Sequence, residues 1–304
     1  MMKKVSFGFM VLAGMLLVAV FPSCGTKKSV VPADTSVVTT KNFKPDVRFT
    51  SLDSLADFMM EEFAVKTPDE FVNRYNLQAA AIQSYGLLNN RKEDEYPLDE
   101  TVCSDLRLLA DSLSGGSTIE MVMCGRIWRG VCHYLTAKDY CSGYSNNPLY
   151  QAEMRDWLAL EDELGSFYVD LAYLTYWGGT IAHVVASGSM WNLAEARQDD
   201  YSKLCKNGPF DTDKTWTIAS ARENFLQELA DAKSLEPYDG EMYDPEGYRA
   251  LLKEMSECAD RVAVLLDKWL DSRAKLCAAE GIPDKHTAHL ITVLGTRIME
   301  LIEG

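Results

Sequence analysis

Residues 157–174 read WLALEDELGSFYVDLAYL, and this stretch decides the fold. Its large apolar residues recur at alternating intervals of three and four: Trp157, Leu160, Leu164, Phe167, Leu171 and Leu174. That spacing places one apolar face along about five turns of α-helix. The same alternation is typical of helices that pack side by side at shallow angles. The stretch therefore predicts a long helix inside a helical bundle.

A second stripe of the same kind lies nearer the C-terminus. Its members are Tyr248, Leu251, Met255, Cys258, Val262, Leu265, Trp269, Ser272 and Leu276. Alternating, strand-like runs are nearly absent, so we predict an all-α fold, a bundle of long helices. Each stripe contains a tryptophan, Trp157 or Trp269, and is followed by a segment that carries an arginine, Arg197 or Arg297. One interpretation of this similarity is that the chain contains two related helical-hairpin units. The other is that the similarity has no common origin, because any two amphipathic helices align loosely.

Turn-forming residues divide the rest of the chain. Thr67-Pro68-Asp69-Glu70 is typical of a helix start, with a cap followed by proline in the first turn. Ser114-Gly115-Gly116-Ser117 separates two helical segments and predicts an antiparallel hairpin. Lys206-Asn207-Gly208-Pro209 is a strong break, after which a helix is expected from about Thr215. The candidate caps for that helix are Asp211, Thr212 and Asp213.

These features predict five regions along the chain. They are a signal peptide at 1–23, a lipidated flexible tether at 24–46, a helical region at 47–145, a long helical hairpin at 146–210 and a C-terminal helical unit at 211–304.

The N-terminus has the three parts of an export signal. Lys3 and Lys4 precede 17 uncharged residues at 5–21, which Pro22 ends, so the run is shorter than a membrane-spanning helix. The Ser-Cys-Gly sequence around Cys24 resembles the lipobox of bacterial lipoproteins, in the form seen in Bacteroides-like bacteria. The resemblance implies cleavage before Cys24, acylation of this residue and anchorage in the bilayer of the outer membrane, on the periplasmic side. Ordinary secretion and an uncleaved anchor are the alternatives.

The mature chain is strongly acidic. Without Lys3 and Lys4, 28 of the 30 basic residues remain against 45 acidic ones, a formal charge of −17. This charge excludes nucleic acid as an expected partner, because phosphates would be repelled. It would steer in a basic protein such as lysozyme, or simply keep the protein soluble.

Seven cysteines follow Cys24, namely Cys103, Cys124, Cys132, Cys141, Cys205, Cys258 and Cys277. Two or three disulfides are compatible with an oxidising periplasm, most readily within 103–141. Helical spacing keeps cysteines of one helix too far apart, so any partners come from different helices. No Cys-x-x-Cys pair is present, which disfavours a zinc ribbon or a thioredoxin-like site.

The C-terminal stripe carries a pattern that resembles a known family. Trp269-x-x-x-Arg273-x-x-x-Cys277, closed by Thr296-Arg297-x-x-x-Leu301, is similar to the pattern of the LprI-type lysozyme inhibitors. Their members are small, exported, helical and cysteine-bearing, and some block lysozyme. The resemblance covers residues 248–301 and implies a protein-binding function. Leu294 departs from it, standing where the family has threonine.

Residues that could carry chemistry are few. His286-x-x-His289 would supply two metal ligands from one helix face but has no evident third. Pro283-Asp284 before this pair indicates a helix start, with both histidines exposed. Cys132 and His133 are neighbours, so on a helix they point about 100° apart rather than at each other. His183 is expected to be a buried, hydrogen-bonded residue. No nucleophile elbow, phosphate-binding loop or dinucleotide fingerprint occurs, so we expect no enzyme activity, no metal and no cofactor.

The aromatic residues around Gly178-Gly179 form the candidate contact patch. They are Tyr173, Tyr176, Trp177 and Trp191. Aromatic side chains beside small residues can bind peptide or sugar, and they can equally form the core of a kinked hairpin.

Together these patterns predict a membrane-anchored, periplasmic helical lipoprotein that acts by binding another protein, in the manner of a lysozyme inhibitor. The alternative is a structural or accessory lipoprotein of an envelope complex.

Overall fold

The structure is a computed structural model. It describes residues 54–55, 58, 67–88, 100–176, 179–206, 216–236 and 244–303, and for residues 83–88 and part of 100–105 only the backbone. All of them belong to one compact unit, Ser36–Gly304. The leader, the tether and Cys24 lie outside the described residues, as does Trp177 of the predicted patch.

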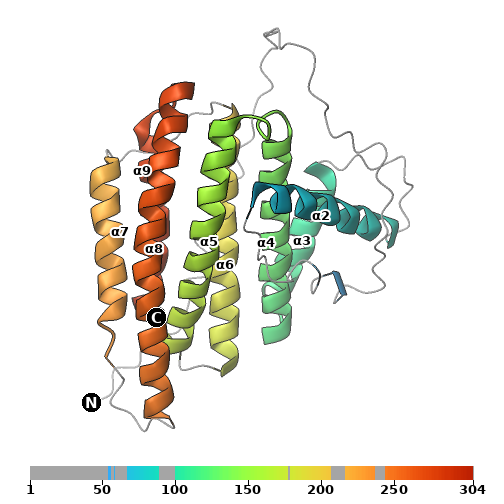
Figure 1. Cartoon of the computed structure of the whole chain (residues 1–304). Coiled ribbons are helices and arrows are strands. Elements are labelled where there is room, and N and C mark those ends of the chain that lie inside the picture. Colours follow the sequence, from blue (N-terminus) through green and yellow to red (C-terminus); the bar gives the residue numbers. More distant parts are fainter. Residues whose placement is uncertain are drawn as a thin grey trace. The chain divides into compact units, whose positions relative to one another are not determined.

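Eight helices make up the described part of the chain (Figure 1). They are α2 (Pro68–Leu88), α3 (Glu100–Leu113), α4 (Thr118–Cys141), α5 (Pro148–Thr175), α6 (Gly179–Lys206), α7 (Ile218–Lys233), α8 (Pro245–Glu280) and α9 (Asp284–Glu303). The described residues include no strand. The predicted all-α bundle of long helices is confirmed.

Local chemistry explains most helix ends. Ser117 caps α4 in a reciprocal capping box with Glu120, which satisfies two backbone N–H groups at that end. Proline occupies the first turn of α2, α5 and α8. Gly281 ends α8 with a φ of 68°, a left-handed conformation that glycine adopts without strain.

The start of α7 differs from the prediction. Thr217 is its N-cap, and its side chain accepts a hydrogen bond from the Ser220 backbone N–H while the Ser220 hydroxyl accepts from that of Thr217. The helix therefore begins at Ile218 rather than near Thr215. A threonine followed three residues later by a hydroxyl side chain satisfies the same N–H groups that an aspartate cap would.

The helices pack in a defined order (Figure 1). α4 packs most extensively on α6, α5 on α8 and α7 on α9, while α5 also lies along α6. α3 packs on α4, and α2 crosses α4 at a steep angle. The predicted boundary between residues 145 and 146 falls in the connection between α4 and α5, within the compact unit.

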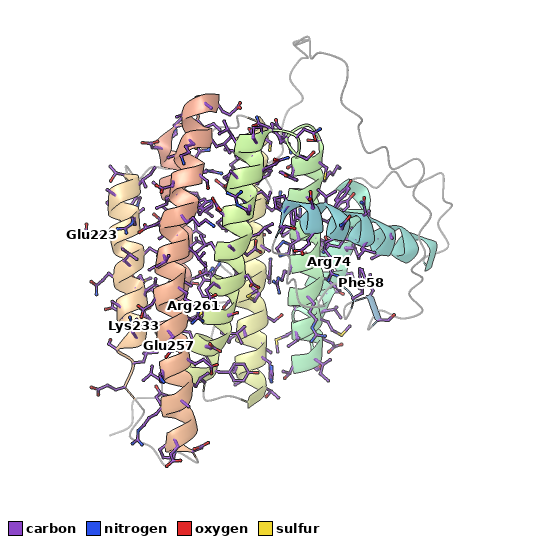
Figure 2. All side chains as sticks on the ribbon, in the orientation of Figure 1. Phe58, Arg74, Glu223, Lys233, Glu257 and Arg261 are labelled. Atoms are coloured by element: carbon purple, nitrogen blue, oxygen red, sulfur yellow. The ribbon has the colours of Figure 1, made fainter. Side chains whose placement is uncertain are left out.

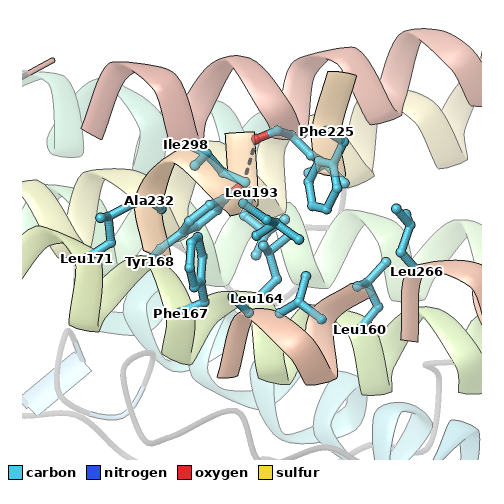
Figure 3. Packing of buried hydrophobic residues seen from close by; sticks show 14 of the residues in the cluster. Leu160, Leu164, Phe167, Tyr168, Leu171, Leu193, Phe225, Ala232, Leu266 and Ile298 are labelled. Atoms are coloured by element: carbon cyan, nitrogen blue, oxygen red, sulfur yellow. Dashed lines mark hydrogen bonds between the residues drawn. The ribbon is translucent and has the colours of Figure 1, made fainter. Parts of the chain in front are cut away.

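The first stripe is buried along its whole length. Every one of its six members is at most 4% exposed. Figure 3 shows Leu160, Leu164, Phe167 and Leu171 of α5 facing residues of other helices, and the Tyr168 hydroxyl there donates to the Leu294 carbonyl oxygen at 3.0 Å. This face of α5 packs in the hydrophobic cluster that also contains α7, α8 and α9.

The second stripe is buried from Met255 onward, except at Leu265. Tyr248, Leu251 and Leu265 are only partly buried, and Leu266 rather than Leu265 is fully enclosed. Ion pairs reinforce the α5–α8 contact at its edge, where Arg261, labelled in Figure 2, contacts Glu163 at 2.6 Å.

None of the seven described cysteines forms a disulfide in the structure. Burial raises the pKa of the Cys132 thiol to about 12 and those of Cys124 and Cys141 to about 11. Within the described residues, no helix has the length and apolar character needed to cross a membrane.

Candidate functional site

An open cleft runs between α4 and α5. Both helices pack along α6 but make few contacts with each other, so α6 forms the floor of the gap. Its volume is about 550 Å³. The lining residues come from α4 (Val122, Gly125, Arg126, Arg129), α5 (Asp162, Gly165, Ser166, Val169, Asp170, Tyr173) and α6 (His183, Ala186, Ser187, Met190).

Two glycines keep the helices of the cleft close to α6. A Cβ on Gly125 would collide with the Ser187 side chain and would also lie 3.1 Å from the Ser187 carbonyl oxygen. A Cβ on Gly165 would meet only the end of the Met190 side chain, which can rotate away. The Ser187 hydroxyl donates to the Val122 carbonyl oxygen at 3.2 Å and so ties α6 to α4.

Polar side chains from α5 and α6 gather at one end of the cleft. The Tyr173 hydroxyl lies 2.8 Å from His183 Nδ1, and the two rings meet edge to face at 5.2 Å. Asp170 lies one turn before Tyr173 on α5 and is half-buried. It makes no hydrogen bond or ion pair with any residue that the structure describes, and burial raises the pKa of its carboxyl group.

Two arginines, Arg126 and Arg129, line the α4 wall. The charges of Glu161 and Asp162 on α5 act on Arg129. Arg129 Nε lies 3.4 Å from His133 Nε2, whose ring in turn contacts the buried carboxylate of Glu161 at 3.1 Å. Burial lowers the pKa of His133 well below its ordinary value, an effect that the charge of Arg129 strengthens.

Behind Glu161 a set of buried charges continues into the core. The Trp157 indole N–H donates to Glu161 at 2.7 Å, and the guanidinium of Arg197 lies over the Trp157 ring, 4.5 Å from its centre. The guanidinium also lies over the Tyr201 ring, 4.6 Å from its centre. Arg197 thereby links the polar residues behind the cleft to the centre of the bundle.

The centre holds four charged side chains, each at most 2% exposed, which we call the buried network: Glu153, Arg197, Asp200 and Arg273. Arg197 binds both carboxylate oxygens of Glu153, at 2.9 and 2.7 Å. Arg273 binds Asp200 at 2.6 Å and Glu153 at 3.2 Å. The two arginines overcome the effect of burial and lower the pKa of Glu153. Two positive and two negative charges balance, and they join α5, α6 and α8.

The family-pattern residues lie mostly inside this core. Trp269 donates its indole N–H to Glu153 at 2.8 Å, Arg273 belongs to the buried network, and Cys277 and Leu301 are 4% exposed. Only Arg297 reaches the surface, where it pairs with Glu300 at 2.5 Å.

The chain matches no family model, no curated protein and no solved structure. The likeness to the LprI-type inhibitors therefore stays a prediction from the pattern. In this structure four of the five pattern residues pack in the interior, so they offer no surface to a partner.

The predicted aromatic patch is divided between two places. Tyr173 lines the cleft, whereas Tyr176 caps α5 and packs against the core. Trp191 stacks on Trp128 with ring centres 5.3 Å apart, and Arg107 lies over the Trp128 ring. The structure thus brings Tyr173 together with His183 rather than with Trp191.

The histidine expectations need correction. His183 is exposed at the cleft rather than buried, whereas His286 is 4% exposed. Within the described residues, no three His, Cys, Asp or Glu side chains are placed to hold a metal ion.

The sequence did contain a signal for the buried charges. Glu153 and Glu161 stand four residues before and after Trp157, which puts both carboxylates on the apolar face of α5. Charges in register with a buried stripe require partners. The cleft had no comparable signal, because it depends on which helices become neighbours.

Proposed function

We propose that this chain is an exported, lipid-anchored binding protein that holds a small ligand in the cleft between α4 and α5. The cleft itself carries the proposal. Its volume of about 550 Å³ is within the range of roughly 300–1,000 Å³ that ligand sites occupy. Most of the accessible surface of its walls is apolar and is interrupted by a few polar groups, which is the usual composition of such sites.

The polar groups of the cleft are suited to recognition. The Ser187 hydroxyl donates to a backbone carbonyl oxygen and His183 interacts with Tyr173, so the two are not arranged as a nucleophile and its base. Asp170 instead offers a half-buried carboxylate that a ligand could neutralise.

A cleft-filling variant tests binding. Ser166 is exposed on the α5 wall, and among the described residues its hydroxyl bonds only to the Asp162 carbonyl oxygen of its own helix. Ser166→Trp should therefore fill the cleft and preserve the fold. The full-length protein, purified in mild detergent from its host, is compared with this variant by native mass spectrometry after incubation with host envelope extract. A low-mass species bound by the wild type and lost in the variant supports the proposal. Equal binding by both proteins, or none, contradicts it.

The anchor is supported by the Ser-Cys-Gly sequence that follows a short apolar leader. Metabolic labelling with a tagged fatty acid should mark the wild type and leave Cys24→Ser unlabelled. Labelling of both proteins, or of neither, removes the anchor from the proposal.

A basic protein such as lysozyme is a second candidate partner, favoured by the formal charge of −17 on the mature chain. Titration of the purified protein with lysozyme at physiological salt tests it, and absence of both binding and inhibition removes it. A structural or accessory role in an envelope complex would instead show as stable partners in a pull-down from membranes.

A further inference from the structure

We propose that the ligand of the cleft is a small molecule with a protonated amine and an apolar body, and that Asp170 and the ring of Tyr173 bind the amine. The inference rests on the proposed function, since it names the class of ligand for the same cleft. Three features of the lining carry it: a carboxylate that no described residue neutralises, an aromatic ring one turn away and apolar walls at the same level of the bundle.

The carboxylate of Asp170 fits an ammonium group. Asp170 lines the cleft and is half-buried, and it has neither a hydrogen bond nor an ion pair with the described residues. A carboxylate that has lost part of its water is stabilised by a positively charged hydrogen-bond donor. A ligand ammonium would supply the charge and the donor together, in a charge-assisted hydrogen bond.

The charges around Asp170 also favour a cation. Burial raises the pKa of its carboxyl group, and the negative charges of Glu254 and Glu163 raise it further, against the opposite effect of Arg261. Arg261 already contacts Glu163 at 2.6 Å. The local potential is therefore negative, so it attracts a positively charged ligand and repels an anion.

The two arginines of the α4 wall do not cancel this potential. Neither Arg126 nor Arg129 is among the groups whose charges chiefly act on Asp170. The charges of Glu161 and Asp162 act on Arg129. Both arginines also have interactions of their own within the protein.

The aromatic ring of Tyr173 lies beside this carboxylate. Tyr173 follows Asp170 by three residues, which is one turn of α5, and it also lines the cleft. Its hydroxyl lies 2.8 Å from His183 Nδ1 and the two rings meet edge to face, so the position of the ring is fixed. An aromatic ring next to a carboxylate is a favourable site for a cationic group.

The contact between Tyr173 and His183 shows which part of α6 faces Asp170. Asp170 is three residues before Tyr173, and Ala186 is three residues after His183. Because α5 and α6 run antiparallel, Ala186 comes level with Asp170. The floor of the cleft beneath the carboxylate is thus a small apolar side chain.

Val122 is the α4 residue at this level. Its carbonyl oxygen accepts a hydrogen bond at 3.2 Å from the hydroxyl of Ser187, the residue that follows Ala186. Val169, next to Asp170 in the chain, lines the cleft as well. Apolar groups from three helices therefore lie near the carboxylate, and burial against them would favour an apolar body on the amine.

Binding of 2-phenylethylamine to the full-length protein tests the inference. The matched probes are 2-phenylethanol, which has the same apolar body without the charge, and phenylacetate, which has the opposite charge. Ligand-observed NMR titrations at pH 7, all in the same detergent buffer, measure the three affinities. We expect the amine to bind about tenfold more tightly than the alcohol, because a hydrogen bond between charged groups is the stronger one, and phenylacetate to bind least.

Two substitutions with the same loss of charge locate the amine. Asp170→Asn keeps the shape of the side chain and should abolish the preference for the amine over the alcohol. Asp271→Asn is the control, since Asp271 is exposed on α8 and does not line the cleft, and it should keep the preference. Asp170 has no ion pair with the described residues, so its variant should fold, and circular dichroism and the melting temperature check this.

The outcomes separate this inference from the proposed function. The amine inference is wrong if 2-phenylethylamine does not bind, if the alcohol or phenylacetate binds wild type as tightly as the amine, or if Asp170→Asn keeps the preference. In each case the comparison of wild type with Ser166→Trp in envelope extract still decides whether the cleft is the site. If the amine binds wild type and Ser166→Trp alike, both the class of ligand and the site are contradicted.

Discussion

Glu153 shows how single residues define the centre of this bundle. Its carboxylate receives N–H donors from Arg197, Arg273 and Trp269, which come from α6 and α8. A buried carboxylate is tolerated only when its charge and lone pairs are satisfied. The periodic stripe predicted that Trp157 and Trp269 are inside. It could not predict which charges would meet there, because the partners are 44 to 120 residues apart.

Glu153→Gln should destabilise the protein strongly. The substitution keeps the shape of the side chain but leaves Arg197 and Arg273 with a single buried counter-charge, Asp200. We expect the free energy of unfolding to fall by about 3–5 kcal/mol in urea denaturation.

The matched control is Glu300→Gln, which breaks the surface pair with Arg297. Its expected cost is at most about 1 kcal/mol. A loss below 1 kcal/mol at Glu153 would show that the buried network does not stabilise the fold.

His286 should make stability depend on pH. Burial, strengthened by the positive charges of Arg273 and Lys285, lowers the pKa of His286 to about 4. In the unfolded chain the pKa is about 6.5, so between pH 6.5 and about 4 the unfolded state binds more protons than the folded state. The free energy of unfolding therefore falls on acidification, with a contribution from this residue of at most about 1.4 kcal/mol per pH unit.

His286→Gln should reduce that slope. Urea denaturation at pH 7, 6 and 5 measures it for both proteins. Burial also lowers the pKa values of His133 and His289, so part of the slope remains in the variant. Identical slopes would show that His286 is not held neutral in the folded state.

The positions of the helices were the most predictable part of the structure. The stripe on α5 and the turn at Ser114–Ser117 correctly predicted α5 and the break between α3 and α4, because a helix that buries one face needs apolar residues with a 3.6-residue period. The residue that caps each helix was harder to predict. Several polar residues near Thr215 could cap α7, and neighbouring packing determines which one does.

Thr217→Ala tests the observed cap of α7. Loss of the side-chain bond to the Ser220 backbone N–H should cost about 1 kcal/mol of unfolding free energy. Thr296→Ala is the control, since Thr296 is exposed inside α9. Alanine is the better helix former there, so its effect should be within about 0.5 kcal/mol or slightly stabilising. Equal effects at both positions would argue against Thr217 as the cap.

Gly125→Ala and Gly165→Ala should differ in sign. The added Cβ at Gly125 meets Ser187 and its backbone, so α4 must move from α6, and overpacking of this kind costs about 1–3 kcal/mol. At Gly165 only the end of Met190 must shift, and the gain in helix propensity, about 0.5–1 kcal/mol, should prevail. Thermal and urea denaturation measure both. A stabilising Gly125→Ala would contradict the close contact between α4 and α6.

At the scale of the whole molecule, the cleft arises from the order in which helices pack. α4 and α5 are neighbours in sequence, yet both pack on α6 and leave a space between them. Helical periodicity shows which face of each helix is buried but not which helix covers it. The sequence therefore indicated Tyr173 as a contact residue, but it could not show that Arg126 and Arg129 of α4 line the same cleft. The proposed anchor and the cleft together describe a protein that holds its ligand near the membrane.

Thiol labelling inside the cleft tests this proposal most directly. Five of the seven described cysteines are buried. Burial raises the pKa values of the thiols of Cys124, Cys132, Cys141, Cys205, Cys258 and Cys277, so these thiols should react slowly with maleimide at pH 7. In Ser166→Cys, one additional thiol should react rapidly, and host envelope extract should slow that reaction about tenfold, as expected for a site that is mostly occupied. A new thiol that reacts as slowly as the native ones, or whose rate the extract does not change, would contradict a ligand site between α4 and α5.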